Sequence, residues 1–129
     1  NLFVANFLGT ANVIQGVILE NDPGCVFRSD KGVEITLRQK SNGKGSIVFR
    51  PQNVQFLKTG TIQKTGTTKF QGIVRHMEFH GNIVRYGVDV GGHLILIDET
   101  HQLGINLFDV DTSVQLQVNP KQIMFIQNQ

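Results

Sequence analysis

The sequence predicts an all-β protein, a small barrel or sandwich assembled from two similar halves. Short runs rich in Val, Ile and Phe recur roughly every 8 to 12 residues, and clusters of Gly, Asn, Asp and Ser separate them. A second observation is a repeat, because residues 47–57 and 116–126 share one pattern at a constant offset of 69 residues. Each copy has a strand, a proline, a short polar turn and an apolar tail, which indicates one supersecondary unit used twice.

The composition is that of an ordinary globular domain. The 129 residues are 40% hydrophobic and 17% charged, with 14 Gly against 3 Pro, which favours many tight turns. The net charge is only +2, the basic residues are scattered and there is no Trp, which argues against a nucleic-acid surface of clustered cations and stacking rings. The single cysteine, Cys25, excludes an intrachain disulfide. No apolar run approaches the roughly 20 residues that a membrane span needs.

The first element we expect is a short helix. Phe3 and Phe7 lie four residues apart and share an apolar stripe with Leu8, and Gly9 follows where a left-handed residue commonly ends a helix. The piece is too short to be stable alone, so we expect its stripe to dock on another surface. Since the chain does not begin with Met, we interpret residues 1–11 as a linker helix from a preceding domain.

From residue 12 onward the pattern predicts strands. We expect them at 12–19, 25–28, 33–37, 46–50, 70–79, 82–90, 93–97, 114–118 and 123–126. Residues 58–69 are rich in Thr, Gly and Lys and have little to bury, so we interpret them as the connection between the halves. The predicted half-modules are about 12–60 and 61–129.

Two prolines and several glycines mark the predicted joints of these modules. We expect the repeat copies around Pro51 and Pro120 to close one module each. We expect Gly16, Gly81 and Gly87, like Gly9, to serve turns or bulges and not ligands.

One cluster has metal-ligating residue types. His76, Glu78 and His80 alternate along a predicted strand, so they share one face, and zinc accepts this ligand set. The spacing is not the helical H-E-x-x-H, however, and the face runs directly into a turn. We therefore predict no metal site and keep these three residues as weak candidates. The favoured interpretation is a solvated strand face with a local His–Glu contact.

The remaining polar clusters also predict no chemistry. Asp98-Glu99 and the pair Asp109 and Asp111 lie among turn residues, where solvated carboxylates are common, and nothing fixes them at a catalytic separation. Residues 41–45 contain two Gly around a Lys but not the phosphate-loop pattern. We expect no catalytic residue and no cofactor-binding residue in this chain.

Three segments resemble one family. Residues 1–12, NLFVANFLGTAN, resemble the segment that leaves the ATP-binding domain in importer ABC ATPases of the maltose, spermidine/putrescine, iron(III) and sulfate types. Residues 48–56, with Arg50-Pro51, resemble that family's V-R-P-E-x-[VI] strand, and residues 70–88 resemble its second module. The chain is thus similar, over essentially its whole length, to the TOBE-type C-terminal regulatory domain of such an ATP-binding subunit.

The resemblance implies a TOBE region of tandem OB-like β-barrel modules, spanning residues 12–129. It implies a regulatory and structural role, holding two ATP-binding subunits together as a homodimer while their nucleotide domains open and close. ATP and Mg would bind in the missing ATPase domain, which would also contact the permease subunits. The expected location is cytoplasmic, peripheral on the inner face of the bacterial cell membrane, with no membrane insertion and no nucleic acid.

The chain departs from the family at a few points, and these limit what the resemblance implies. The ATPase motifs are missing, so we expect this chain not to be an enzyme. The resemblance implies that the parent protein is an ABC transporter ATPase. Gln52 replaces a frequent Glu, and Asp111-Thr112 stands where a Gly-Asp turn is common. The resemblance assigns Arg50, Pro51, Gly81 and Pro120 to structure.

Two alternatives from other classes stay open. One is an oxyanion- or small-ligand-binding β-module of the molybdate type, for which Thr112-Ser113 and Lys121 are faint hints. The other is an OB-like single-strand nucleic-acid binder, which needs exposed Phe rings on one sheet face.

Overall fold

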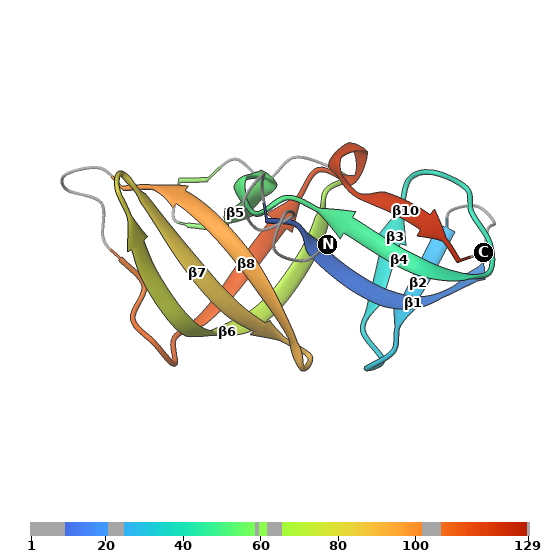
Figure 1. Cartoon of the computed structure of the whole chain (residues 1–129), viewed down its shortest axis with the longest axis horizontal. Coiled ribbons are helices and arrows are strands. Elements are labelled where there is room, and N and C mark those ends of the chain that lie inside the picture. The colour runs from blue at the N-terminus through green and yellow to red at the C-terminus, as the bar shows by residue number, and fades with distance from the viewer. Residues whose placement is uncertain (1–9, 21–24, 59, 62–65, 102–106, 129) are drawn as a thin grey trace.

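The computed structural model describes residues 10–20, 25–58, 60–61, 66–101 and 107–128. Two five-stranded sheets form two units that lie side by side along the long axis of the molecule (Figure 1). The predicted linker helix, with Phe3, Phe7, Leu8 and Gly9, lies outside the described residues. Within the described ranges, no helix is long and apolar enough to cross a membrane.

The strands are all antiparallel to their neighbours. The first sheet has the order β10-β4-β1-β2-β3, and the second has the order β5-β9-β6-β7-β8. The bounds are β1 Asn12–Glu20, β2 Cys25–Ser29, β3 Glu34–Leu37, β4 Lys44–Phe49, β5 Val54–Phe56, β6 Thr68–His80, β7 Ile83–Val90, β8 His93–Thr100, β9 Ser113–Val118 and β10 Met124–Gln127. Two short 3-10 turns, η1 (Pro51–Asn53) and η2 (Pro120–Gln122), complete the set. The predicted all-β fold class is confirmed.

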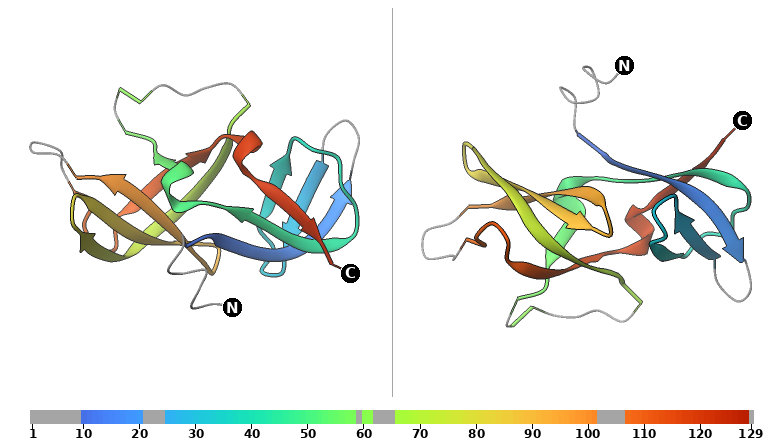
Figure 2. Two further views of the ribbon diagram at one scale, coloured as in Figure 1. Left: turned by 45° about the horizontal axis from the view of Figure 1, so that its top comes forward. Right: turned by 90° about the horizontal axis from the view of Figure 1, so that it is seen from below.

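The two copies of the repeat connect the sheets. After η1 the chain enters β5, which pairs with β9 in the second sheet, and after η2 it enters β10, which pairs with β4 in the first. Figure 2 shows the same crossing from two further sides. Each copy therefore spans both units, where we expected it to close one. The predicted halves, 12–60 and 61–129, do not follow the sheets, because each sheet takes one strand from the other half.

Alternating burial along the strands builds the core. In β3, Ile35 and Leu37 are buried while Glu34 and Thr36 are exposed, as in a sheet with one wet face. In the second unit, the Phe56 ring lies edge-on to Tyr86 at 5.0 Å between centroids. Each such buried ring contributes on the order of 1.5–3 kcal/mol.

The glycines have different roles. Gly81 has φ of 63° in the turn between β6 and β7, a conformation that suits glycine. Gly87 pairs with His76 where the register of β6 shifts, which is the predicted bulge. Gly16 instead lies in the regular middle of β1, so that prediction is wrong there. A Cβ on Gly16 would lie 2.2 Å from the Arg28 carbonyl oxygen, so the close approach of β2 excludes a side chain.

Candidate functional site

Asn12, at the start of β1, attaches the first unit to the second. Its Nδ2 donates to the Leu96 carbonyl at 2.9 Å, and its Oδ1 accepts from the Leu96 N–H at 2.7 Å. The side chain thus satisfies a backbone pair on β8, an edge strand of the second sheet. Asn12 is only 4% exposed. Buried amides that meet backbone groups in both directions fix a geometry, because a lost partner leaves a desolvated polar group.

The turn after β2 meets the turn before β8 at a second contact. Lys31 Nζ donates to the Gly92 carbonyl at 2.8 Å, and His93 Nε2 lies 2.8 Å from Ser29 Oγ, which also accepts from the Val33 N–H. A Cβ on Gly91 would lie 2.4 Å from Val33 Cγ2, so the turns are in close contact. We call this contact, together with the pair Asn12 and Leu96, the joint.

The surroundings of His93 in the joint affect its protonation. Burial lowers the pKa of His93, Lys31 lowers it further, and Asp30 and Asp89 oppose the shift. The neutral ring is therefore the form that the folded joint favours, because a charged ring would lose solvation and repel Lys31.

An ionic row crosses the second sheet. Glu78, Arg85 and Asp98 are aligned across β6, β7 and β8. Arg85 forms a two-point pair with Asp98, at 2.7 Å from Nε to Oδ1 and 2.8 Å from Nη2 to Oδ2. The hydrogen bond to Asp98 raises the pKa of Arg85, against the effect of burial. Arg85 Nη1 also donates to Thr10 Oγ1 at 3.1 Å, which fixes the entry of the chain into β1.

The outer face of the first sheet has an exposed apolar surface. Val13, Val48 and Met124 are aligned across β1, β4 and β10, and Ile126 lies one row further along the same face of β10. Val13 is 57% exposed, Met124 58% and Ile126 52%. We call these four residues the apolar stripe. A contiguous apolar patch of this kind is typical of an interaction surface.

The predicted His–Glu contact is present. His80 Nε2 lies 2.9 Å from Glu78 Oε2, and both side chains are more than half exposed. His76 lies beside the position of Gly87, two residues before Glu78. Among the described residues, no group of three or more His, Cys, Asp or Glu side chains could hold a metal ion.

Three of the four carboxylates in the predicted pairs, Asp98, Glu99 and Asp111, form ion pairs with cations. Asp98 pairs with Arg85, and Glu99 lies 2.9 Å from Lys58 Nζ. Asp111 pairs with Arg75 at 2.7 Å. Asp111 fits the solvated turn charge that the sequence predicts, since its side chain is 73% exposed. For Asp98 and Glu99 that prediction is wrong, because both lie within β8 and their side chains are only 14% and 23% exposed.

The residues that suggested an oxyanion site do not lie together. Ser113 opens β9 and Lys121 follows the other end of that strand, so a six-residue strand of about 20 Å separates them.

The exposed Phe rings that a nucleic-acid binder needs can be checked in the same way. Of the described phenylalanines, Phe79 alone is clearly exposed, at 57%. The row of exposed rings that a nucleic-acid surface needs is therefore not found in the described ranges.

Sequence reasoning missed the joint. Asn12 looked like an ordinary strand start, and Ser29 and His93 lie 64 residues apart in the chain. The sequence offered one signal. Asn12 lies two residues before Ile14, on the face of β1 that alternation directs inward, and a polar residue at such a position needs a hydrogen-bond partner.

The described residues form a tandem β-module, in which two antiparallel sheets each take one strand from the other half of the chain. Solved structures support the fold: the chain matches the cytoplasmic molybdate-binding protein ModG, in the form with molybdate bound, at a TM-score of 0.69 and 14% identity. The match covers 91% of this chain and 96% of that one, which supports the OB-like architecture.

The chain belongs to the TOBE domain family, whose model matches residues 47–126. It is 34% identical over 89 residues to the molybdate/tungstate import ATP-binding protein WtpC of Pyrococcus abyssi, covering 69% of this chain. It is 26% identical over 110 residues to the Fe(3+) ions import ATP-binding protein FbpC of Haemophilus influenzae, covering 84% of this chain. The chain spans only 24% and 30% of the lengths of these two relatives. The resemblance to importer ATP-binding subunits is thereby confirmed.

Proposed function

We propose that this chain is the regulatory and dimerisation domain of the ATP-binding subunit of an ABC importer. The proposal follows from its family and from relatives that are import ATP-binding proteins. The domain acts mechanically: it holds a subunit pair together and so limits how far the ATPase domains separate. ATP and Mg belong to the ATPase domain of the parent protein. The permease subunits contact that domain, on the inner face of the bacterial membrane.

The apolar stripe is the observation that carries the dimerisation role. Its outward-facing side chains lie on three neighbouring strands, so they form one surface and not scattered residues. A two-fold interface places the same patch of both subunits face to face. Stable interfaces bury about 800 Å² per partner, so the stripe is the centre of the contact and its surroundings supply the rest.

The joint supplies the stiffness that such a role requires. Two small modules connected only by a linker would move independently. Here each sheet contains one strand from the other half of the chain, and the hydrogen bonds of Asn12 add a second connection. A displacement of one module is therefore transmitted to the other.

Sedimentation equilibrium tests the dimer. The chain should associate at a concentration of about 100 μM, since exposed apolar interfaces of modest size give micromolar affinities. Met124→Glu should shift the equilibrium toward monomer by about tenfold or more, because it buries a charge in the contact. Val110→Glu is the control, since Val110 is 50% exposed in a turn outside the stripe.

Two results contradict this assignment. A wild-type chain that stays monomeric at millimolar concentration removes the dimerisation role. A monomer whose free energy of unfolding falls with Met124→Glu shows instead that a segment of the same chain covers the stripe. The sequence upstream of Asn1 tests the parent, because a Walker A motif, a signature motif and a switch His must be encoded there.

A further inference from the structure

The loop between β3 and β4 contains a carboxamide beside an unshielded backbone nitrogen. Asn42 is followed directly by Gly43, and no other asparagine of the sequence precedes a glycine. Both residues are exposed and lie just before β4 begins at Lys44. The backbone nitrogen that follows an asparagine can attack its side-chain carbonyl carbon, and a glycine leaves that nitrogen uncrowded because it has no Cβ.

The contacts of Gly43 leave its nitrogen available. The Gly43 carbonyl accepts from the Ile18 N–H at 2.9 Å, which fixes the residue beside β1. Within the described ranges, the Gly43 N–H itself makes no hydrogen bond. The φ of Gly43 is 81°, a conformation that residues with a side chain rarely adopt. The nitrogen is therefore exposed and unengaged in a residue that is held in place.

Gln127, in β10, contacts the carboxamide of Asn42 although 85 residues separate them in the chain. Its Nε2 donates to Asn42 Oδ1 at 3.2 Å. The same Nε2 lies 3.0 Å from the position of a Cβ on Gly43, so it fits there because Gly43 has none. A donor on a carbonyl oxygen stabilises the negative charge that develops when a nucleophile adds to the carbon. Gln127 therefore favours attack at Asn42 Cγ.

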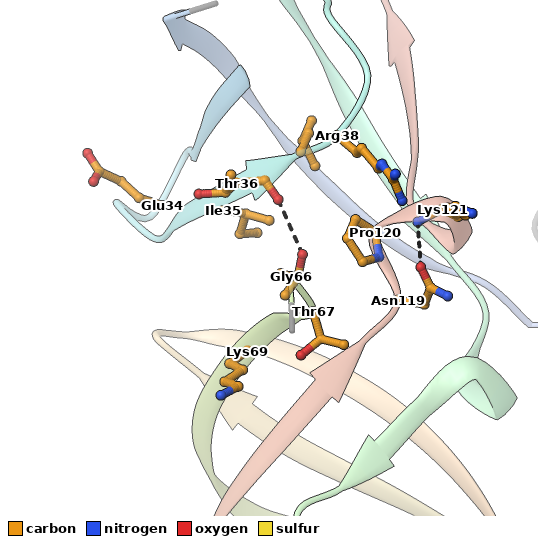
Figure 3. Close-up of a pocket in the computed structure, with 12 residues that line it drawn as sticks. Glu34, Ile35, Thr36, Arg38, Gly66, Thr67, Lys69, Asn119, Pro120 and Lys121 are labelled. Atoms are coloured by element: carbon orange, nitrogen blue, oxygen red, sulfur yellow. Dashed lines mark hydrogen bonds between the residues drawn. The ribbon is translucent and has the colours of Figure 1, made fainter. Parts of the chain in front are cut away.

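The other described asparagines lack this combination. Asn12 is buried, and its carboxamide is bound through both the nitrogen and the oxygen. Asn119 precedes Pro120, which has no N–H to react, and its Oδ1 accepts from the Lys121 N–H at 3.0 Å (Figure 3). The rest are each followed by a residue whose Cβ crowds the nitrogen: Asn53, Asn82 and Asn128.

We propose that Asn42 is a self-modifying residue, which converts spontaneously to a mixture of aspartate and isoaspartate. The Gly43 nitrogen attacks Asn42 Cγ and forms a C–N bond, and the bond from Cγ to Nδ2 breaks as ammonia leaves with the proton of the Gly43 N–H. Water then opens the cyclic imide, at Cγ to give aspartate or at the backbone carbonyl carbon to give isoaspartate. Either product lowers the net charge of +2 by one. The reaction goes beyond the dimerisation role, because it requires no second subunit.

Peptide mass spectrometry of the wild-type chain tests the proposal. The chain is held in mildly alkaline buffer at body temperature and digested at intervals. The peptide with Asn42 should gain about one mass unit, because OH replaces NH2, and should separate into aspartyl and isoaspartyl forms. The peptide with Asn82, which is exposed in a turn but precedes the β-branched Ile83, should keep its mass in the same samples. Mildly acidic buffer should suppress the conversion, because the attacking nitrogen must lose its proton.

Replacing Gln127 by Ala tests the contribution of the fold. Gln127→Ala should slow the conversion of Asn42 about two- to tenfold, because it removes the hydrogen bond to Oδ1. In urea that hydrogen bond is absent, so wild type and Gln127→Ala should convert at equal rates. Gln122→Ala, at an exposed glutamine of η2, is the control and should react like wild type. Thermal melting of each variant establishes that it is folded in the absence of urea.

The proposal is overturned if the peptide with Asn42 keeps its mass, or if Asn82 converts as fast as Asn42. Equal rates in folded wild type and folded Gln127→Ala, or a difference that persists in urea, contradict the role of Gln127. Sedimentation measures association and not the mass of a peptide, so the failure of this reaction and the failure of the dimer are distinguishable.

Discussion

Replacing Asn12 by Ala tests whether the joint stabilises the whole chain. The side chain makes two hydrogen bonds with the backbone of Leu96, of 2.9 and 2.7 Å, and is almost fully buried. Each intramolecular hydrogen bond contributes about 0.5–1.5 kcal/mol net, and a desolvated group left without a partner costs about 1–3 kcal/mol. Leu96 is half-buried, so water reaches part of the vacated position. We expect the free energy of unfolding to fall by about 2–3 kcal/mol.

Urea unfolding gives the measurement, because a change in midpoint at constant slope is a change in stability. Asn42→Ala is the matched control: Asn42 accepts one bond from Gln127 Nε2 at 3.2 Å between exposed side chains. Its loss should cost less than about 0.5 kcal/mol. The Leu96 amide should also exchange faster in Asn12→Ala.

The reasoning is refuted if Asn12→Ala and Asn42→Ala unfold within about 0.5 kcal/mol of each other. Two separate unfolding transitions in Asn12→Ala, with the first domain-sized step at lower urea, would support the joint as the coupling element. One transition at a lower midpoint supports it as a source of stability.

Three further predictions follow from single contacts. Stability should fall as pH drops below about 6.5, because the folded joint lowers the pKa of His93 and the unfolded chain binds the proton more readily; His93→Gln should flatten that decline in pH-dependent thermal melts. Gly16→Ala should cost about 1–3 kcal/mol by overpacking, since its Cβ would lie 2.4 Å from Phe27 Cζ. Asp98→Asn should cost about 1–2 kcal/mol in urea unfolding, because it weakens the two-point pair with Arg85.

A specific result would contradict each of these three predictions. Equal pH slopes in wild type and His93→Gln remove His93 as the cause of acid sensitivity. A Gly16→Ala variant as stable as Gln15→Ala, an exposed change on the same strand, shows that β2 shifts without cost. The control for Asp98→Asn is Asp111→Asn. The pair of Asp111 with Arg75 is largely exposed, so it contributes little to the free energy of unfolding. Equal losses from both changes mean that burial does not strengthen the pair with Arg85.

The strands were predictable because their signal is local. Alternation in residues 33–37 and the turn glycine at Gly81 depend on neighbours two or three positions away, and both elements occur as expected. The contact of Glu78 with His80 was predictable for the same reason, since alternate residues of one strand share a face.

The candidate sites were not predictable in the same way. The stripe joins β1, β4 and β10, and Met124 reaches Val48 only because β10 pairs with β4 across the molecule. The contacts between the two sheets also unite residues that are distant in the chain, such as Thr36 with Thr68 and Asn12 with Leu96. Nothing in the spacing of these residues marks them as neighbours.

By itself the sequence determined the all-β class, nearly every strand, the repeat around Pro51 and Pro120, and the TOBE resemblance, since short-range propensity and motif order fix these features. The tertiary structure alone decided that the repeat tails exchange between sheets. The physical reason is that a strand's own residues specify its extended form and its apolar face, whereas its partner is selected by which long-range pairing buries that face best. The joint and the apolar stripe both result from that selection.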